Sequence, residues 1–324
     1  MNKEDLRIIF MGTPEFAVPS LDILLKNKYN IVGVITVPDK PAGRGQKLSE
    51  SAVKKFAIEK GLAVYQPEKM KDDEFQRIIK EELKPDLQVV VAFRMLPESV
   101  WKLPKYGTFN LHSSLLPQYR GAAPINWAVI NGDKETGVTT FFIDEKIDTG
   151  NIIYQEKTNI GINETAGDVH DRLMNIGSKL VLKTVDSIIN NTISPLAQES
   201  LVNNALKPAP KLNKDNCKVN WLQDAKIIKD HIHGLSPYPA AWSELYNIET
   251  KETIPFKIFK AGNISEIHEL KNGTILTDQK NYLKIACSNS FLEIKNIQIA
   301  GKKAMEVSEF LRGFRFNEKW VVKY

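Results

Sequence analysis

The sequence predicts a Rossmann-like α/β domain with an open, mostly parallel sheet, followed by a small OB-like β-barrel domain at the C-terminal end. The chain has 324 residues, more than the roughly 150 of a typical domain, so two domains are expected. The first part alternates apolar runs with helical patterns, as βαβ proteins do. The last part instead contains five short strand-like segments punctuated by turns, a pattern typical of small barrels.

The chain opens with a predicted βαβ unit. Leu6–Met11 is a continuous apolar run, which indicates a strand buried on both faces. A turn and a helix over 16–26 follow, and Ile31–Val37 forms a second predicted strand. The turn is not a dinucleotide-binding fingerprint, because Pro14 and Phe16 stand where that motif needs glycines. A nicotinamide-dependent dehydrogenase is therefore disfavoured.

A loop rich in proline and glycine, V-P-D-K-P-A-G-R-G-Q-K-L, is predicted over 37–48. Such a loop is expected to be exposed and mobile. The glycines beside Arg44 let its backbone approach a partner, and an arginine side chain offers a planar fork of donors for phosphates or base edges. Lys40 and Lys47 add positive charge. The loop is either a nucleic-acid contact or an ordinary solvated loop whose charges serve solubility.

Further α/β units complete the first domain. Helices are predicted over 51–60, 71–82 and 125–131. Strands are predicted over 63–65, 87–92, 108–111, 137–143 and 151–155, of which the last two should pair. Thr165 and Asp168 resemble a capping box that opens a long amphipathic helix ending near Asn190.

The domain boundaries follow from a change of pattern. We expect a first domain over 1–190, a proline-containing linker over 191–208 with little periodicity, and a barrel domain over 209–324. The barrel strands are expected over 241–245, 256–261, 273–277, 282–286 and 291–299.

Net charge is +5 but unevenly distributed. From Ala205 onward there are 19 Lys+Arg and 13 Asp+Glu, so the preceding residues hold 25 of the 44 basic and 26 of the 39 acidic side chains. A neutral part joined to a basic part suggests catalysis in the first and a polyanion contact in the second. The alternative is a solvated lysine-rich surface.

Composition favours a cytoplasmic globular protein, with 42% hydrophobic and 26% charged residues. No apolar run reaches the roughly 18 residues of a membrane helix, and the charged start M-N-K-E-D is unlike a signal peptide, so no membrane contact is expected. Cys217 and Cys287 are too few for a disulfide framework or a cysteine-rich zinc site. His231 and His233 lack the further ligands that a metal needs, so no metal is expected.

The candidate catalytic residues begin at the end of the strand predicted over 108–111. Asn110 and His112 are two residues apart, so they should project to the same side of the strand, at the sheet edge where open α/β proteins bind ligands. An amide donor beside an imidazole suits a carbonyl oxygen that gains negative charge during reaction. The alternative is that both side chains only hydrogen-bond loop backbone.

Asp148 follows a strand that is expected to neighbour the one carrying His112. A nearby carboxylate favours the protonated form of an imidazole and fixes its orientation. Asn110 and His112 would then stabilise an oxyanion, while Asp148 helps to move a proton from an attacking amine. The sequence has no G-x-S-x-G nucleophile elbow, which disfavours a hydrolase triad. The alternative for Asp148 is a turn residue that caps its own backbone.

The run F-N-L-H-S-S-L-L-P-Q-Y-R-G-A-A-P-I-N-W, followed by I-D-T-G-N-I, resembles the formyltransferase family that uses 10-formyltetrahydrofolate. The resemblance implies that Asn110, His112 and Asp148 are the catalytic set and that 10-formyltetrahydrofolate is the co-substrate, without a metal.

The resemblance also implies which residues contact the folate. The family's S-L-L-P segment matches Ser114, Leu115, Leu116 and Pro117. The loop at 93–97 should line the pterin pocket, through residues such as Phe93 and Leu96. Within it, Phe93-Arg94-Met95 departs from the family's usual Tyr-Gly and a following apolar residue.

The G-T-P-E-F turn, the P-A-G-R-G loop and the basic C-terminal half are similar to family members whose acceptor is initiator methionyl-tRNA, with a role in translation initiation. This implies that the loop with Arg44, Lys40 and Lys47 meets the tRNA acceptor arm and that the barrel holds the tRNA body. We expect a monomer. One alternative is another folate-dependent enzyme, a sugar-amine formyltransferase or a formyltetrahydrofolate hydrolase. A second is an RNA-binding protein whose transferase domain is inert.

Overall fold

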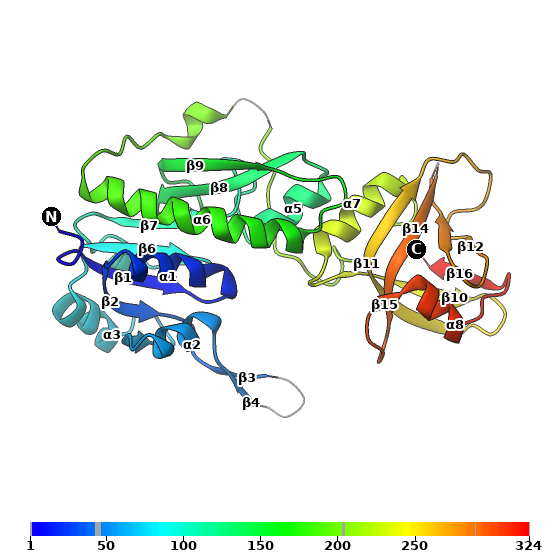
Figure 1. Cartoon of the computed structure of the whole chain (residues 1–324), viewed down its shortest axis with the longest axis horizontal. Helices are drawn as coiled ribbons and strands as arrows, with labels where there is room; N and C mark the ends of the chain where they lie inside the picture. The colour runs from blue at the N-terminus through cyan, green and yellow to red at the C-terminus, as the bar shows by residue number, and fades with distance from the viewer. Residues whose placement is uncertain (1, 43–46, 203–204, 289, 324) are drawn as a thin grey trace. The chain divides into compact units, whose positions relative to one another are not determined.

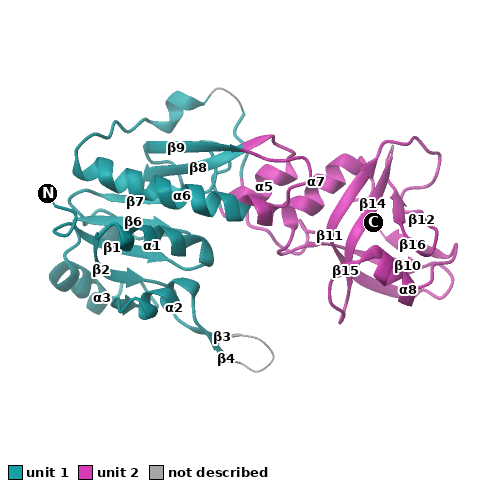
Figure 2. Cartoon of the chain, viewed as in Figure 1, with its two compact units in different colours: residues 1–121, 136–158, 170–208 teal, residues 122–135, 159–169, 209–324 magenta. Residues whose placement is uncertain are grey.

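A computed structural model of the chain describes residues 2–42, 47–202, 205–288 and 290–323. The chain forms two compact units (Figure 2). Unit 1 contains residues 1–121, 136–158 and 170–208, and unit 2 contains residues 122–135, 159–169 and 209–324. Residues 191–208, the connecting segment, therefore cluster with unit 1, while two short stretches of the N-terminal half cluster with the C-terminal residues.

Unit 1 is built on a seven-stranded sheet. Its strands lie in the order β5 (Val64–Tyr65), β2 (Asn30–Ile35), β1 (Arg7–Gly12), β6 (Leu87–Val91), β7 (Thr108–His112), β8 (Glu135–Phe142) and β9 (Ile152–Asn159) (Figure 1). The strands from β5 to β7 are parallel, and β8 runs antiparallel to β7. The predicted open, mostly parallel sheet is confirmed, as is the pairing of β8 with β9.

Helices bury both faces of this sheet. Figure 1 shows α1 (Val18–Lys26) and α6 (Ala166–Ile189) over one face. The other face packs against α3 (Asp73–Arg77) and the segment after it, in a core that includes Ile9 and Val90. Because neither face of β1 or β6 meets water, both strands are apolar almost throughout.

The capping box predicted at the start of α6 is confirmed. Thr165 N donates to Asp168 Oδ2 at 2.8 Å, and Asp168 N donates to Thr165 Oγ1 at 3.3 Å. The single helix expected over 71–82 is wrong in its second half, where α3 gives way to a π-helical segment, η2 (Ile78–Leu83). The remaining helices of unit 1 are α2 (Ala52–Glu59), α4 (Glu98–Trp101) and the short η1 (Glu15–Ala17) and η3 (Gln198–Leu201).

The proline-rich loop contains more order than expected. β3 (Lys40–Ala42) and β4 (Lys47–Ser49) pair antiparallel, with Lys40 opposite Ser49. The prediction of an irregular loop was therefore wrong for these two arms, because alternate backbone groups of such arms can pair even where proline removes one donor. Arg44 lies outside the described residues, as does the side chain of Lys47.

Unit 2 contains the predicted barrel. Its strands lie in the order β12 (Ile275–Thr277), β13 (Leu283–Ala286), β14 (Phe291–Ile299), β11 (Thr253–Ile264), β10 (Ala241–Asn247) and β16 (Trp320–Lys323), with β15 (Met305–Glu306) on β14. Described neighbours pair antiparallel, and a bridge between Thr274 and Val321 brings the edge strands together. The five expected strands correspond to β10–β14. The helices of this unit are α5 (Pro124–Ile130), α7 (Ala225–Leu235) and α8 (Val307–Gly313), of which α7 and α8 were not predicted.

Within the described part of the chain, no helix combines the length and the apolar character needed to span a bilayer.

Candidate active site

The candidate site begins at β7, which lies between β6 and β8. Leu111 faces α6, where a Cβ at Gly177 would approach its Cδ2 to 2.7 Å. Since side chains alternate along a strand, Asn110 and His112 lie on the opposite face. His112 is the last residue of β7 and its exposed fraction is only 6%. The strand thus delivers both side chains to one side of the carboxyl edge, as expected.

The His112 ring is held by a backbone carbonyl. Its Nε2 lies 2.9 Å from Tyr119 O. Because a carbonyl oxygen only accepts hydrogen bonds, Nε2 must carry a proton. Nδ1 then points to Asp148, with 3.9 Å between Nδ1 and Oδ2, and the edge of the Phe141 ring flanks the imidazole. Nδ1 is therefore the nitrogen that remains to act on a substrate.

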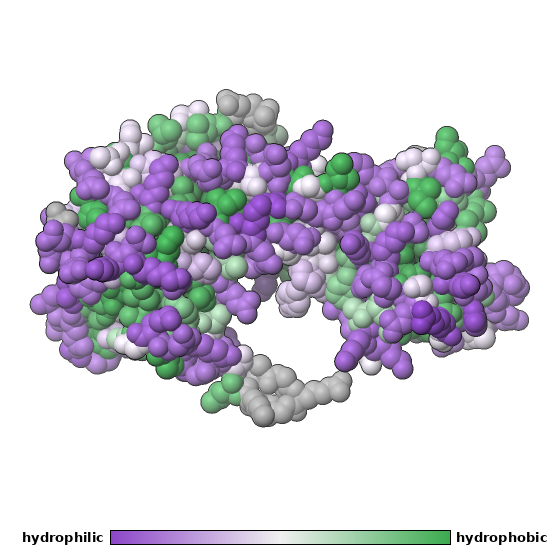
Figure 3. Space-filling view, viewed as in Figure 1, coloured by the Kyte–Doolittle hydropathy of each residue, from purple (hydrophilic) through white to green (hydrophobic). Residues whose placement is uncertain are grey.

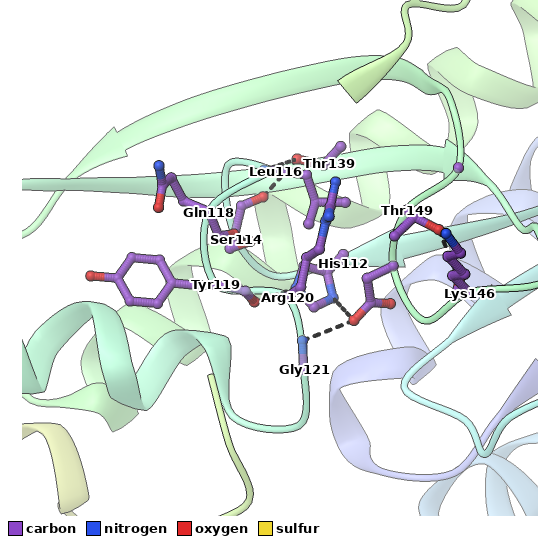
Figure 4. Close-up of polar contacts among 12 residues, drawn as sticks. His112, Ser114, Leu116, Gln118, Tyr119, Arg120, Gly121, Thr139, Lys146 and Thr149 are labelled. Carbon is purple, nitrogen blue, oxygen red and sulfur yellow. Dashed lines mark hydrogen bonds and ion pairs between the residues drawn. The ribbon is translucent and has the colours of Figure 1, made fainter. Parts of the chain in front are cut away.

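Asp148 lies in a tight turn whose backbone is fixed from several sides. Its φ is +56°, in the left-handed region, and its Oδ2 accepts a hydrogen bond from Gly121 N at 2.9 Å (Figure 4). Gln198 Nε2 donates to Asp148 O at 2.9 Å and to Gly150 O at 2.8 Å. Only glycine fits at 150, since a Cβ there would lie 1.7 Å from Phe142 O. The turn is thus built to present one carboxylate.

The gap between His112 and Asp148 is too long for a direct hydrogen bond. A nitrogen or oxygen atom beside them can nevertheless lie at hydrogen-bond distance, about 2.8 Å, from both. An amine or a water molecule at this place would contact the imidazole and the carboxylate together.

Asn110 is half-buried and occupies the position on β7 between Val90 of β6 and Phe141 of β8. Its side chain makes no hydrogen bond to any other residue in the described portion of the chain. Its amide donors are therefore free to contact a ligand.

The segment expected to contact folate is fixed by the sheet beneath it. Thr139 Oγ1 on β8 donates to Ser114 O at 2.6 Å and accepts from Leu116 N at 3.1 Å (Figure 4). Gln155 Nε2 on β9 donates to Leu116 O at 2.8 Å. The Ser114 hydroxyl donates to Gln118 O at 2.6 Å, so it is already used within the chain. Ser114, Leu116 and Pro117 are buried, and Leu115 is half-buried.

The loop after β6 is anchored by the residue that departs from the family pattern. Arg94 Nη1 donates to Glu68 O at 2.9 Å, Nη2 donates to Pro67 O, and the guanidinium lies 5.6 Å from the centre of the Phe93 ring. Phe93 is half-buried, while Leu96 is buried in the core. Arg94 therefore ties this loop to residues 67–68.

Lysines and aromatic rings meet on the outer side of β10 in unit 2. Trp242 has Lys214 Nζ at 5.2 Å and Lys218 Nζ at 5.7 Å from its ring centre. Tyr246, four residues further along β10, has Lys323 Nζ at 5.8 Å from its ring centre. Figure 3 shows hydrophilic side chains over much of the visible surface of unit 2. Rings and cations gathered in this way suit a nucleic-acid backbone and its bases.

The two histidines of α7 have structural surroundings. His233 Nε2 lies 3.0 Å from Ala261 O, and burial lowers the pKa of both His231 and His233. Searching the described residues finds no group of three or more His, Cys, Asp or Glu side chains placed to hold a metal. Both cysteines are buried free thiols.

Sequence reasoning missed three contributors to the site: the Tyr119 carbonyl, the Gly121 amide and Gln198. The first two belong to the run Q-Y-R-G, but a backbone group has no residue-type signal. Gln198 lies in the connecting segment, where no periodic pattern singles out any residue.

Comparison with known proteins covers most of the chain. The formyl transferase family matches residues 6–185, and the formyl transferase C-terminal domain family matches residues 211–315.

Several relatives match over nearly their whole length. A protein named methionyl-tRNA formyltransferase from Bacteroides thetaiotaomicron is 54% identical over 319 residues, 98% of each chain. A protein of the same name from Flavobacterium johnsoniae is 51% identical over 316 residues, again 98% of each chain.

Solved structures share the fold. An N-formyltransferase from Helicobacter canadensis, in complex with folinic acid and dTDP-3-aminofucose, superposes with a TM-score of 0.64 at 25% identity, over 89% of this chain and 98% of that one. WlaRD, a sugar 3N-formyl transferase in the presence of dTDP and 5-N-formyl-THF, superposes with a TM-score of 0.62 at 25% identity, over 92% and 99%.

Proposed function

This chain belongs to the formyl transferase family, and from that premise we propose that it transfers the formyl group of 10-formyltetrahydrofolate to the methionine of initiator methionyl-tRNA, for translation initiation. The acceptor is the α-amino group of that methionine. Relatives about half identical over nearly the whole chain carry the name methionyl-tRNA formyltransferase. The similar N-formyltransferase structure with folinic acid supports a folate as the formyl donor.

The observation that carries the mechanism is the placement of His112 Nδ1 opposite the Asp148 carboxylate. In the first step the amine forms a bond to the formyl carbon, and the formyl oxygen becomes an oxyanion. The Asn110 amide and the Nδ1–H of protonated His112 donate to that oxygen, which lowers the barrier because both donors are already in place. Tyr119 O keeps Nε2 occupied, so the ring cannot turn away.

Asp148 organises the proton that the attacking amine must lose. Its carboxylate takes that proton directly or through water, and the bond from the formyl carbon to N10 of the folate then breaks as N10 is protonated. Formylated methionyl-tRNA and tetrahydrofolate leave. Since the amine attacks unaided when held close, no serine or cysteine nucleophile is required.

Transfer of a labelled formyl group to methionyl-tRNA by the purified protein tests this proposal directly. His112→Ala should lower turnover by a factor of hundreds, because it removes a donor to the oxyanion. Affinity for tRNA should change little, because in this mechanism His112 contacts the formyl oxygen and not the body of the tRNA. Equal losses of turnover and tRNA affinity would argue against the catalytic assignment.

We propose a division of labour between the two halves of the sequence. Residues 1–190 carry out catalysis, 191–208 link, and 209–324 hold the tRNA body, with the loop that carries Arg44, Lys40 and Lys47 at the acceptor arm. Arg44→Ala should weaken discrimination between initiator and elongator methionyl-tRNA. Unchanged selectivity would contradict the role of the loop.

A sugar amine is the second candidate acceptor, because the solved structures at 25% identity include sugar N-formyltransferases. Adding a dTDP-amino sugar to the same assay separates the two, and we expect no formylation of it.

We further propose that the protein acts as a monomer in the cytoplasm. The proposed acceptor, methionyl-tRNA, exists where proteins are synthesised, which supports this compartment. Sedimentation of the purified protein at assay concentration would reveal a dimer if this were wrong.

A further inference from the structure

Two residues of the candidate site, the hydrogen-bond partner of His112 and the catalytic candidate Asp148, have unfavourable backbone conformations. Tyr119, whose carbonyl holds His112, has φ of +60°, and Asp148 has φ of +56°. Residues other than glycine adopt such angles at a cost and keep them only where neighbouring groups hold the backbone. The conformations of both residues therefore need an external support.

The connecting segment contacts both of them. Near its start, Leu196 pairs with Ile152 through two backbone hydrogen bonds of 2.8 and 2.9 Å. Gln198 follows and donates its two amide hydrogens to Asp148 O and Gly150 O. Near its end, Tyr119 N donates to Lys207 O at 2.7 Å. A single stretch of chain thus holds the Asp148 turn at one end and the backbone of the His112 partner at the other.

Gln118 strengthens the second of these contacts. Its Oε1 accepts from Lys207 N at 2.8 Å, beside the bond between Tyr119 N and Lys207 O. Gln118 and Tyr119 therefore bind the same residue of the connecting segment, which fixes the direction of the Tyr119 carbonyl toward His112.

Arg120 strengthens the contact between Gln198 and the Asp148 turn. Its Nε and Nη2 donate to Gln198 Oε1 at 3.0 and 2.7 Å. Gln198 is fully buried. All four hydrogen-bonding positions of its amide are occupied, two as donors and two as acceptors. A buried network of this kind is rigid, because any rotation leaves a polar group without a partner.

We propose that Gln198 and Arg120 are positioning residues for formyl transfer. Together they hold the Asp148 turn so that its carboxylate faces His112 Nδ1, and neither touches the reacting atoms. This inference rests on the proposed function. Gln198 lies between the two stretches that match the family, 6–185 and 211–315, so the family match does not assign it a role.

The most informative variant is Gln198→Glu. It keeps one oxygen as the acceptor for Arg120 but replaces the NH2 group, and with it both donors, by a second carboxylate oxygen. A carboxylate oxygen would then face two carbonyl oxygens, and the turn would shift. Displacement of a reacting group by about 1 Å can cost on the order of 100-fold in rate. We expect turnover with methionyl-tRNA to fall 30- to 100-fold, on the order that such a displacement allows. The KM values for 10-formyltetrahydrofolate and tRNA should stay within about threefold, because neither substrate loses a contact.

Two further variants make the result specific. Ser200→Ala removes a hydrogen bond to Ala197 O in the same helical turn without touching the Asp148 turn, so its turnover should equal that of the unaltered protein. Arg120→Lys keeps the charge but not the paired donors, and it should lower turnover with the same unchanged KM values, by less than Gln198→Glu. It serves as the test if Gln198→Glu does not fold.

Three outcomes distinguish a failure of the proposed function from a failure of the positioning role. An unaltered protein that does not formylate methionyl-tRNA overturns the proposed function and this inference with it. An active protein whose Gln198→Glu and Arg120→Lys variants keep full turnover overturns the positioning role alone. If the variants lose turnover and also have a lower Tm and weaker folate binding, the network serves general stability. That result would also overturn the positioning role.

Discussion

At the scale of single residues, the candidate site depends on which polar groups already make hydrogen bonds within the protein. Tyr119 O accepts a hydrogen bond from Nε2 of His112, which leaves Nδ1 for the substrate. Gly121 N donates a hydrogen bond to Asp148 Oδ2, and the other acceptor positions of the carboxylate stay available to a ligand. The side-chain amide of Asn110, in contrast, makes no hydrogen bond to any other described residue. The candidate catalytic atoms are therefore those that the fold leaves without a hydrogen-bond partner.

Asn110→Ala should accordingly separate activity from stability. Removing one oxyanion donor should lower turnover about 100- to 1,000-fold. The free energy of unfolding should change by less than about 0.5 kcal/mol, since no hydrogen bond within the protein is lost. Single-turnover kinetics and urea denaturation measure the two quantities.

Asn126→Ala is the matched control for this prediction. Asn126 Nδ2 donates to Gly234 O at 2.8 Å, which joins α5 to α7. Its loss should cost about 1 kcal/mol of stability and leave turnover intact, as a purely structural hydrogen bond does. If Asn110→Ala instead behaved like Asn126→Ala, the oxyanion role would be refuted.

At the scale of elements, α6 supports the strand that carries the candidate residues Asn110 and His112. Gly177 lets the helix approach Leu111 closely, and Thr140 on β8 shares a 2.8 Å hydrogen bond with Thr184 on the helix. The capping box at its start satisfies backbone donors that the first helical turn leaves free. Thr165→Ala should therefore destabilise the protein by about 1 kcal/mol. Turnover per folded molecule should not change.

The same capping box predicts a pH dependence. The hydrogen bonds from Thr165 hold the pKa of Asp168 below its usual range. Since the pKa is lower in the folded state, this stabilisation is present above about pH 4, the ordinary pKa of an aspartate, and is lost as the pH falls further. The cost of Thr165→Ala, measured by denaturation at pH 7 and pH 3.5, should be smaller at the lower pH. An equal cost at both would show that Asp168 contributes nothing.

The elements that could be predicted are those whose defining interactions join residues close together in the sequence. β1 and β6 were found because burial on both faces leaves an apolar run, and the capping box because its partners are three residues apart. The proximity of Asp148 to His112 was expected because β7 and β8 were expected to be neighbours. α7 also carried a signal, since Asp224 caps it and Ile228, Ile232 and Leu235 share a face.

Other features had no local signal. The π-helical η2 results from how this segment packs in its core, and the pairing of β3 with β4 involves a proline that argues against a strand. The contact from Gln198 to the Asp148 turn spans 50 residues and starts in an aperiodic stretch. Only the three-dimensional structure reveals a contact of this kind.

At the scale of the whole molecule, charge separates the two ends of the sequence. The residues from Ala205 onward carry the excess of positive charge, and the lysines around Trp242 belong to that region. Binding to RNA through such a surface releases counterions, so affinity should fall steeply with salt. Affinity measured without stating the salt concentration would be uninformative for this protein.

Replacing both Lys214 and Lys218 with alanine tests the surface around Trp242. If each lysine neutralises one phosphate, the slope of log affinity against log salt should become less negative by about one to two. Filter binding of methionyl-tRNA between 50 and 200 mM salt, about the range over which such effects are large, measures the slope. The matched variant with arginine at both positions should keep it. An unchanged slope in the alanine variant would place the RNA elsewhere.

The backbone pairing of Leu196 with Ile152 has a practical consequence for recombining these enzymes. Consider a chimaera that takes its barrel from a relative and is joined directly after α6, near the end of the first family match. This graft would replace residues 191–208, which hold the Asp148 turn, with the segment of the relative. A junction after Pro208 would keep the native segment. The two grafts would share every catalytic side chain and still differ in rate.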